Sequence, residues 1–399
     1  MDKRMSAESF MGVGGGSITA ESARNLRIGE DLCRKRKPNE AAPYLLKALE
    51  DPNNIDAIIQ MAFLMSTINE GLELLEEGVA RGRRHLIRQF GPDCFEDDRA
   101  GSRVGQFWGL LETRPYMRVL QAIVRLAFEV KDYQKAANTI IEMLRLCPGD
   151  NMGQRFWLGS VLLQAGRTAD ALSFAQVWLN LPRDVDWPPR GGCTFEPPSK
   201  TPLSAAASEE HKYSPCSLLY TAALASYKLW GDCDVSRQYL SVAAKANPHI
   251  LVRILAKVEQ PKTLNNLPRA PNGPEEAHDY LWLTQNLWMA SDVWEWVNND
   301  AGAKSHILKT CSREGCHTRE VRAAEFKRCG GCKEVVYCGA ACQKEDWQAH
   351  KKSCKEHQKQ KEFMRAMMAG RSMPRSGSGD GPIVASTDFT PNGIATTFH

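Results

Sequence analysis

Eight potential zinc ligands, seven cysteines and one histidine, stand close together in the last quarter of the 399-residue chain. They follow one another as Cys311-x4-Cys316-x12-Cys329-x2-Cys332-x5-Cys338-x3-Cys342-x7-His350-x3-Cys354. A structural zinc ion takes four sulfur or nitrogen ligands in a tetrahedron and leaves no position for water. The eight ligands therefore predict two structural Zn2+ ions, and the regular spacing makes buried free thiols a poor alternative.

The spacing leaves open which four ligands share an ion, because sequential and interleaved pairings both satisfy two zinc ions. His350 and Cys354 stand four residues apart, which places both on one face of a helix. Since each ion has four protein ligands, we expect closed sites that stabilise the fold and do not catalyse a reaction. A finger of this size buries too little apolar surface to fold without its metal.

Residues between the ligands carry a family resemblance. The runs Tyr337-Cys338-Gly339 and Cys342-Gln343-x3-Trp347-x2-His350-Lys351, together with the ligand spacing, resemble the MYND zinc finger over residues 311–354. We therefore predict a finger domain at 304–358. The resemblance implies an interleaved arrangement, with one ion bound by Cys311, Cys316, Cys338 and Cys342 and the other by Cys329, Cys332, His350 and Cys354.

The same resemblance implies a binding role for the finger. MYND fingers are usually protein-interaction modules, and some bind short proline-rich peptides beside the last helix. Gln343 and Trp347 match the positions tied to peptide contact, and a preordered proline-rich strand packs well on an aromatic surface. The alternative is that Trp347 only packs the small zinc core. We interpret His306, His317 and His357 as exposed residues that bind no zinc.

Composition indicates an ordinary soluble protein with two or three domains. Hydrophobic residues make up 43% of the chain and charged residues 25%. The sequence shows neither an apolar run long enough to span a membrane nor an apolar signal core after Asp2, Lys3 and Arg4. Clustered cysteines suggest metal binding in a reducing compartment, so we expect an intracellular protein of the cytoplasm or nucleus.

Charge is distributed unevenly. Residues 304–361 contain 14 Lys or Arg against seven Asp or Glu, which gives +7, whereas the whole chain is +4. Two zinc sites with seven thiolates would lower the formal charge of this segment to about +4. This favours acidic protein partners weakly and is too little for a nucleic-acid footprint, because acidic residues interleave with the basic ones.

A repeated pattern predicts a mostly α fold at 18–300. Gly29, Leu32, Ala41 and Pro52 recur at the same spacing as Gly159, Leu162, Ala171 and Pro182, with a weaker copy at Arg125, Phe128, Ala137 and Pro148. Small, large, small and proline positions at these offsets are typical of tetratricopeptide-like helical hairpins, in which small residues lie where the two helices cross. An irregular helical bundle with chance matches is the alternative.

Other segments complete the expected organisation. Residues 1–17 and 365–399 are rich in small and polar residues, so we predict a disordered N-terminus and a disordered tail. A proline-rich loop is expected at about 182–215. Helices are expected near 216–230 and 234–246, and a single helix from Glu275 to Val297 whose four tryptophans pack against the other helices.

The helical part also resembles a second family. The segments 107–117, Asp150-Asn151 and 246–249 are similar to the suppressor-of-tumorigenicity-seven family and related tetratricopeptide-like proteins, over about residues 85–300. Animal members of that family span membranes, whereas this sequence predicts no span. The family supplies no established catalytic chemistry, so Glu112 and Arg114 are interpreted as structural residues.

These features favour a non-enzymatic adaptor that binds partner proteins through a helical-repeat surface and a zinc finger. A SET-type lysine methyltransferase is one alternative, since MYND fingers also occur in such enzymes, but no Asn-His or Gly-rich cofactor motif is recognisable here. A nucleic-acid-associated transcriptional regulator is the other, and it would require basic residues gathered on one face.

Overall fold

The computed structural model describes residues 7–265, 267, 269–368, 385–390 and 393–398. The chain forms two compact units. The first extends to Lys309 and also includes Arg319–Glu325, whereas the second comprises Thr310–Thr318 and the chain from Phe326 onward. The predicted finger boundary at 304 therefore falls within a helix of the first unit.

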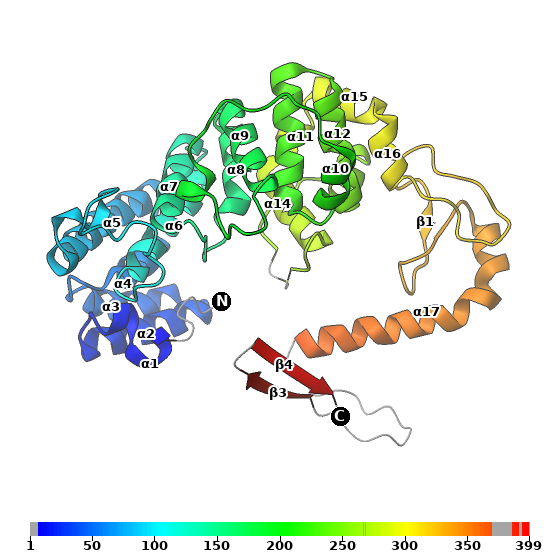
Figure 1. The fold of residues 1–399 in the computed structure, drawn as a ribbon. Helices are drawn as coiled ribbons and strands as arrows, with labels where there is room; N and C mark the ends of the chain where they lie inside the picture. Colours follow the sequence, from blue (N-terminus) through cyan, green and yellow to red (C-terminus); the bar gives the residue numbers. More distant parts are fainter. Residues whose placement is uncertain (1–6, 266, 268, 369–384, 391–392, 399) are drawn as a thin grey trace. The chain divides into compact units, whose positions relative to one another are not determined.

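The first unit is built from helices that stack in chain order, from blue to yellow in Figure 1. Its α-helices are α1 (Ala7–Met11), α2 (Ala20–Arg34), α3 (Pro38–Ala48), α4 (Ile55–Ala62), α5 (Ile68–Phe90), α6 (Arg114–Glu129), α7 (Tyr133–Leu146), α8 (Arg155–Gln164), α9 (Thr168–Leu179), α10 (Ala205–His211), α11 (Cys216–Trp230), α12 (Asp234–Ala246), α13 (Pro248–Leu255), α14 (Pro274–Trp288), α15 (Ser291–Asn299) and α16 (Ala301–Ile307). Short 3-10 helices are η1 (Val13–Gly15), η2 (Pro92–Phe95) and η3 (Pro189–Gly192). The mostly α class is confirmed.

Local sequence explains where many of these helices begin. The Thr67 hydroxyl accepts a hydrogen bond from the backbone amide of Glu70, and the Glu70 carboxylate accepts one from the backbone amide of Thr67. These two reciprocal hydrogen bonds start α5. Asp132 accepts the amide of Lys135 in the same way at α7. Pro38 occupies the first turn of α3, where a missing amide hydrogen costs nothing.

Helical hairpins occur where the repeat pattern predicted them, as α2–α3, α6–α7 and α8–α9. Gly29 lies at the predicted crossing, because a Cβ there would stand 2.5 Å from a methyl carbon of Leu45 on α3. Gly159 does not. A Cβ at Gly159 would stand 2.7 Å from Thr221 on α11, so this glycine permits close packing on the following hairpin and not on its own partner α9.

The tryptophan-rich segment departs from the expected single helix. Residues 275–297 divide into α14 and α15, which Met289 and Ala290 separate. The break lets Trp288 and Trp296 both enter the core, at 0% and 6% exposure. Trp282 packs on Phe128 and on Trp157, with ring centroids 4.9 and 5.6 Å apart, so α14 contacts helices far back in the chain.

The N-terminal segment is ordered where the structure describes it, against the expectation of disorder over 1–17; residues 1–6 lie outside the description. Glu8 of α1 is buried and its carboxylate pairs with the Arg118 guanidinium at 2.8 Å. Arg118 also pairs with Asp56 of α4 at 2.7 Å. This buried ion cluster holds α1 against α4 and α6.

The proline-rich loop at 182–215 is also more structured than its composition suggests, since it contains η3 and α10. The Trp178 indole nitrogen donates to the Gly191 carbonyl at 3.0 Å. The Gln176 side chain donates to the Ser199 carbonyl and accepts the Ser199 amide, at 2.7 and 2.8 Å. Side chains of α9 thus satisfy the backbone of this loop.

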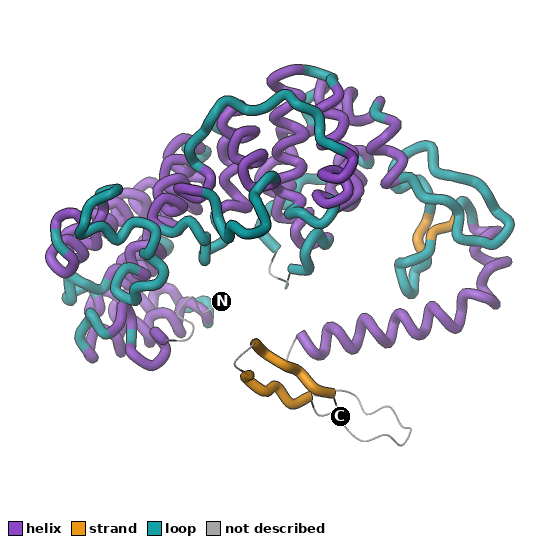
Figure 2. Tube along the Cα trace, in the orientation of Figure 1, coloured by secondary structure: helices purple, strands orange, loops and turns teal. Residues whose placement is uncertain are grey.

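The second unit contains little regular structure apart from one long helix. Strands β1 (Lys327–Arg328) and β2 (Val336–Tyr337) form an antiparallel pair, α17 spans Ala340–Met368, and β3 (Ala385–Thr390) pairs with β4 (Gly393–Phe398). Figure 2 shows these strands in orange and α17 in purple. Within the predicted disordered tail at 365–399, residues 365–368 belong to α17 and the β3–β4 pair occupies 385–390 and 393–398, whereas residues 369–384, 391–392 and 399 lie outside the description. No described helix combines the length and apolarity needed to cross a membrane.

Candidate metal centre

The first ligand cluster brings together cysteines from two loops and a helix. Its members are Cys311, Cys316, Cys338 and Cys342. Neighbouring sulfur atoms lie close together, with Cys338 3.4 Å from Cys342, and Cys316 3.8 Å from both Cys338 and Cys342. Cys342 is held in the first turn of α17, and Cys338 directly follows β2. Cys311 is buried whereas Cys338 is exposed, so this cluster lies near the surface of the finger.

The second cluster is the more deeply buried one. Its members are Cys329, Cys332, His350 and Cys354. The sulfur atoms of Cys329 and Cys354 lie 3.8 Å apart, and the sulfur of Cys332 lies 3.4 Å from Nε2 of His350. Cys329 directly follows β1, and α17 supplies both His350 and Cys354 from one face, as their spacing predicted.

Both clusters have the dimensions of a tetrahedral zinc site. The ligand atoms of each lie within 4.8 Å of one another. With zinc–sulfur bonds of about 2.3 Å, a tetrahedron places two sulfur atoms about 3.8 Å apart. The donor set and the distances therefore fit one structural zinc ion per cluster, and the arrangement is interleaved. The sequential pairing that the spacing had left open is excluded.

Hydrogen bonds orient the ligands. The Cys329 amide donates to the Val335 carbonyl at 2.9 Å, which closes the β1–β2 turn around Cys332. The Ser353 hydroxyl lies 3.3 Å from Nδ1 of His350, on the side of the ring opposite the ligand nitrogen. A partner on the second ring nitrogen fixes the orientation of a histidine ligand.

The protonation of the cysteines reflects their crowding. Hydrogen bonds from Thr318, first from its side chain and then from its backbone, lower the pKa of Cys316 to about 6. In contrast, the contact with Cys338 and then burial raise the pKa of Cys342 to about 12. Adjacent thiols resist ionising together, and a divalent cation among them reverses this because it stabilises every thiolate.

Gln343 and Trp347, which were predicted to contact peptide, lie on α17 one helical turn apart. Trp347 is 42% exposed and stands outside the small apolar core that Phe326, Val336 and Tyr337 form with the cysteines. Its ring contacts His350 edge-on, with centroids 6.2 Å apart. Packing of the zinc core therefore leaves a large part of the indole accessible.

Sequence reasoning missed several supporting residues. The Tyr337 hydroxyl donates to the Asp346 carboxylate at 2.6 Å, which joins β2 to α17. Glu320 is 4% exposed, and it exchanges hydrogen bonds with the Lys309 backbone at 2.8 and 2.9 Å. Arg319–Glu325 thus packs with the first unit although it lies between two zinc ligands in sequence. No local pattern marks these pairs, because each joins residues at least nine positions apart.

The remaining cysteines and the three histidines that flank the finger lie outside both ligand clusters. Six cysteines in the described part of the chain are free thiols outside the clusters: Cys33, Cys94, Cys147, Cys193, Cys216 and Cys233. Burial raises the pKa of both Cys193 and Cys216 to about 12, which is typical of unreactive buried thiols. His306, His317 and His357 are exposed and lie outside both clusters.

Comparison with known proteins identifies the finger. The MYND finger family matches residues 309–354. The chain is 43% identical over 61 residues to F-box protein At5g50450 of Arabidopsis thaliana, a stretch covering 15% of this chain and 18% of that protein. It is 57% identical over 51 residues to Tudor domain-containing protein 1 of Oryzias latipes, 13% of this chain and 4% of that protein. It is 44% identical over 41 residues to N-lysine methyltransferase SMYD2 of Gallus gallus, 10% of this chain and 9% of that protein.

These relatives share only a short stretch with the chain, which spans less than a fifth of the length of each. The match to SMYD2 falls at the finger. The family match, the ligand spacing and the two tetrahedral clusters agree with one another. The segment 309–354 is therefore a MYND finger, a zinc-binding protein-interaction module with ligands for two structural ions.

Proposed function

We propose that the protein is a non-enzymatic adaptor that binds partner proteins through its MYND finger and its helical unit. The observation that carries this proposal is the accessible face of α17, where Trp347 is 42% exposed beside two zinc clusters that use all their ligands for folding. A rigid aromatic held on a metal-stabilised helix loses little entropy on binding, so it makes an effective anchor for a peptide.

A proline-rich peptide is the ligand that suits this face. Such a segment is already extended before it binds, and its rings pack on exposed aromatic side chains. Gln343, one turn before Trp347, supplies an amide that can donate to a backbone carbonyl of the peptide. Because Trp347 lies outside the apolar core of the finger, its removal should leave the zinc sites intact.

The test replaces the exposed aromatic and leaves the metal sites alone. Trp347→Ala should weaken binding of a labelled proline-rich peptide by about 30-fold, the loss of roughly 2 kcal/mol that is typical of an aromatic anchor. Phe363→Ala is the matched control, since Phe363 is 44% exposed on α17 beyond the last zinc ligand. Fluorescence anisotropy gives the affinity and mass spectrometry the zinc content. Unchanged affinity with two zinc ions retained would refute the peptide face.

The absence of catalysis is part of the proposal. Both ligand clusters are complete, so neither offers the open coordination position that a catalytic zinc needs. The similarity to SMYD2 covers 9% of that enzyme, and the other relatives carry different names, which supports the finger as a module independent of one reaction. Incubation with a labelled methyl donor and histones tests this, because transfer above a heat-treated control would contradict it.

We also place the protein in a reducing intracellular compartment, the cytoplasm or the nucleus. Seven of the 13 cysteines lie in the two ligand clusters and the other six are free thiols. Such usage suits cells that keep thiols reduced. A fluorescent fusion that entered the secretory pathway would overturn this placement.

A further inference from the structure

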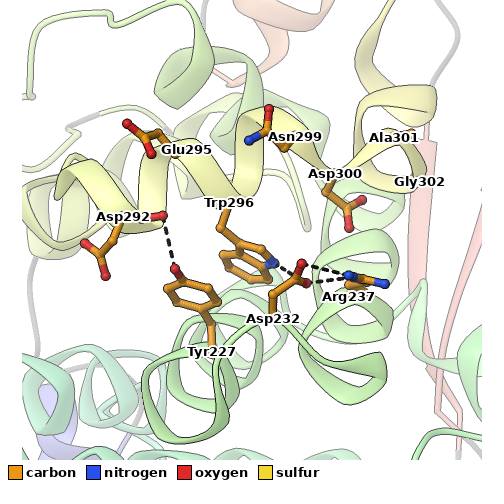
Figure 3. Close-up of a pocket in the computed structure, with 10 residues that line it drawn as sticks. All are labelled: Tyr227, Asp232, Arg237, Asp292, Glu295, Trp296, Asn299, Asp300, Ala301 and Gly302. Atoms are coloured by element: carbon orange, nitrogen blue, oxygen red, sulfur yellow. Dashed lines mark hydrogen bonds and ion pairs between the residues drawn. The ribbon is translucent and has the colours of Figure 1, made fainter.

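A cavity of about 630 Å3 lies in the first unit, far from the zinc ligands in sequence. It is bounded by α15 and the start of α16 on one side and by the corner between α11 and α12 on the other (Figure 3). Tyr227 and Trp296 form one wall, with their rings stacked 4.2 Å apart at 13°. The Tyr227 hydroxyl donates to the Asp292 carbonyl at 3.1 Å, which fixes the ring against α15.

The rest of the lining is strongly acidic. Asp232, Asp292, Glu295 and Asp300 face one cation, Arg237, so the formal charge of the cavity is four negative against one positive, or −3. Arg237 is already paired, because its guanidinium donates twice to Asp232 at 2.7 Å. The indole nitrogen of Trp296 donates to the same carboxylate at 3.1 Å.

The other three carboxylates form no ion pair with any residue in the described part of the chain, although the charge of Asp300 still acts on the Arg237 guanidinium. Asp300 accepts the Ala303 amide and caps α16 with one oxygen. Asp292 and Glu295 are exposed, one turn apart on α15, and form no ion pair with any residue that the structure describes. Burial and then the charges of Asp292, Asp232 and Glu295 raise the pKa of Tyr227, so the negative field reaches the aromatic wall.

We propose that this cavity binds the side chain of a lysine or arginine in a basic peptide segment of a partner protein. Trp296 is only 6% exposed, so the half-buried Tyr227 ring is the aromatic side chain that can meet a cation. Carboxylates at the rim accept charge-assisted hydrogen bonds from the same cation. The volume lies within the range of about 300–1,000 Å3 typical of ligand pockets. The inference rests on the proposed adaptor function only in that the ligand is a peptide, since the cavity uses no zinc ligand and no residue of α17.

The test removes two of the three unpaired carboxylates, Asp292 and Glu295, from the zinc-loaded full chain. The probe is a fluorescein-labelled peptide of alternating glycine and arginine, with glycine–lysine and glycine–glutamate peptides as comparisons, at a fixed 0.15 M salt. The combined variant Asp292→Asn/Glu295→Gln should weaken binding of the basic peptides about tenfold, because two charge-assisted contacts are lost. Glu21→Gln/Glu73→Gln is the matched control, since it removes two exposed carboxylates from helices outside the cavity.

The outcomes separate this site from its alternatives. Equal weakening in the control would mean diffuse attraction to the whole protein and would overturn the proposal, as would binding that the first variant leaves unchanged. The variant carries only exposed isosteric changes, and its thermal transition confirms folding. Trp347→Ala should keep full affinity for the basic peptide, so the failure of the finger to bind proline-rich peptide can be told apart from a failure of this cavity.

Discussion

Cys332 shows how much depends on one ligand in the finger. Its side chain is fully buried, and its sulfur lies 3.4 Å from Nε2 of His350. Serine offers zinc a much poorer donor, so Cys332→Ser should lower the zinc content from two ions to one. Native mass spectrometry measures this, with Cys233→Ser, a half-buried thiol outside both clusters, as the control. Two ions retained by Cys332→Ser would exclude it as a ligand.

Asp150 gives the first unit a dependence on pH. Its carboxylate accepts the amides of Gln154 and Arg155 at 2.7 and 2.8 Å, and burial raises its pKa to about 6. Because the pKa is higher in the folded than in the unfolded state, ionisation of Asp150 destabilises the fold. The free energy of unfolding that Asp150 contributes therefore falls as pH rises from about 4 to about 6.

The variant Asp150→Asn cannot ionise and should lose this dependence. Its free energy of unfolding, relative to that of the wild type, should increase by about 2 kcal/mol from pH 4 to pH 7. Urea unfolding followed by tryptophan fluorescence measures both proteins, and their difference cancels any pH effect of the finger. A difference that stays constant across this range would show that Asp150 ionises normally in the fold.

At the level of elements, buried ion pairs hold α1 against the rest of the helical unit, and apolar contacts contribute little. Glu8 and Asp56 are both buried and both paired with Arg118. Arg118→Met should lower the free energy of unfolding by about 3–5 kcal/mol, because it removes the cation paired with buried Asp56 and leaves buried Glu8 with only Arg114, 3.9 Å away. Arg84→Met removes the exposed pair with Glu77 and should cost less than about 1 kcal/mol.

Chemical denaturation compares the two arginine variants directly. If Arg118→Met costs no more than Arg84→Met, then α1 does not depend on the ion cluster. The comparison is informative because both changes remove one cation from a helix of the first unit, and they differ in the burial of the partner carboxylates.

For the whole molecule, the two units should respond differently to the loss of metal. Among the residues that the structure describes, the buried core of the second unit contains Phe326, Val336 and Tyr337 besides its cysteines, with Val335 packed at its edge, which is too little to hold the finger without zinc. Lys327, Arg328 and Lys333 already have exposed side chains, but the zinc ligands beside them hold the backbone in place. Chelation should therefore release this backbone, speed up tryptic cleavage at these residues and leave the thermal transition of the first unit in place. Continued protection of these sites without zinc would show that the finger folds without metal.

Several features could be predicted because they depend on residues that are close in sequence. The helices α11 and α12 end at the residues expected, since Gly231 and Asn247-Pro248 interrupt helical hydrogen bonding locally. The short spacing within each ligand pair likewise predicted eight zinc ligands. The family resemblance then supplied the interleaving, which the clusters confirm.

Contacts between distant residues escaped prediction. The composition of residues 1–17 suggests disorder, yet Glu8 is held by Arg118, 110 positions away. The Glu275–Val297 pattern suggests one helix, but two buried tryptophans require a break at Met289 and Ala290 to face different neighbours. Gly159 fits a repeat position, but the side chain that a Cβ at this position would collide with is Thr221, which belongs to another hairpin.

The sequence by itself therefore determined the zinc ligands and the helical hairpins, because metal-ligand spacing and helix capping act over a few residues. Only the tertiary structure showed which residues hold α1 against α4 and α6. It also placed Arg319–Glu325 with the first unit and gathered four acids around Tyr227 and Trp296. These arrangements depend on burial and on charges brought together by packing, which no short window of sequence records.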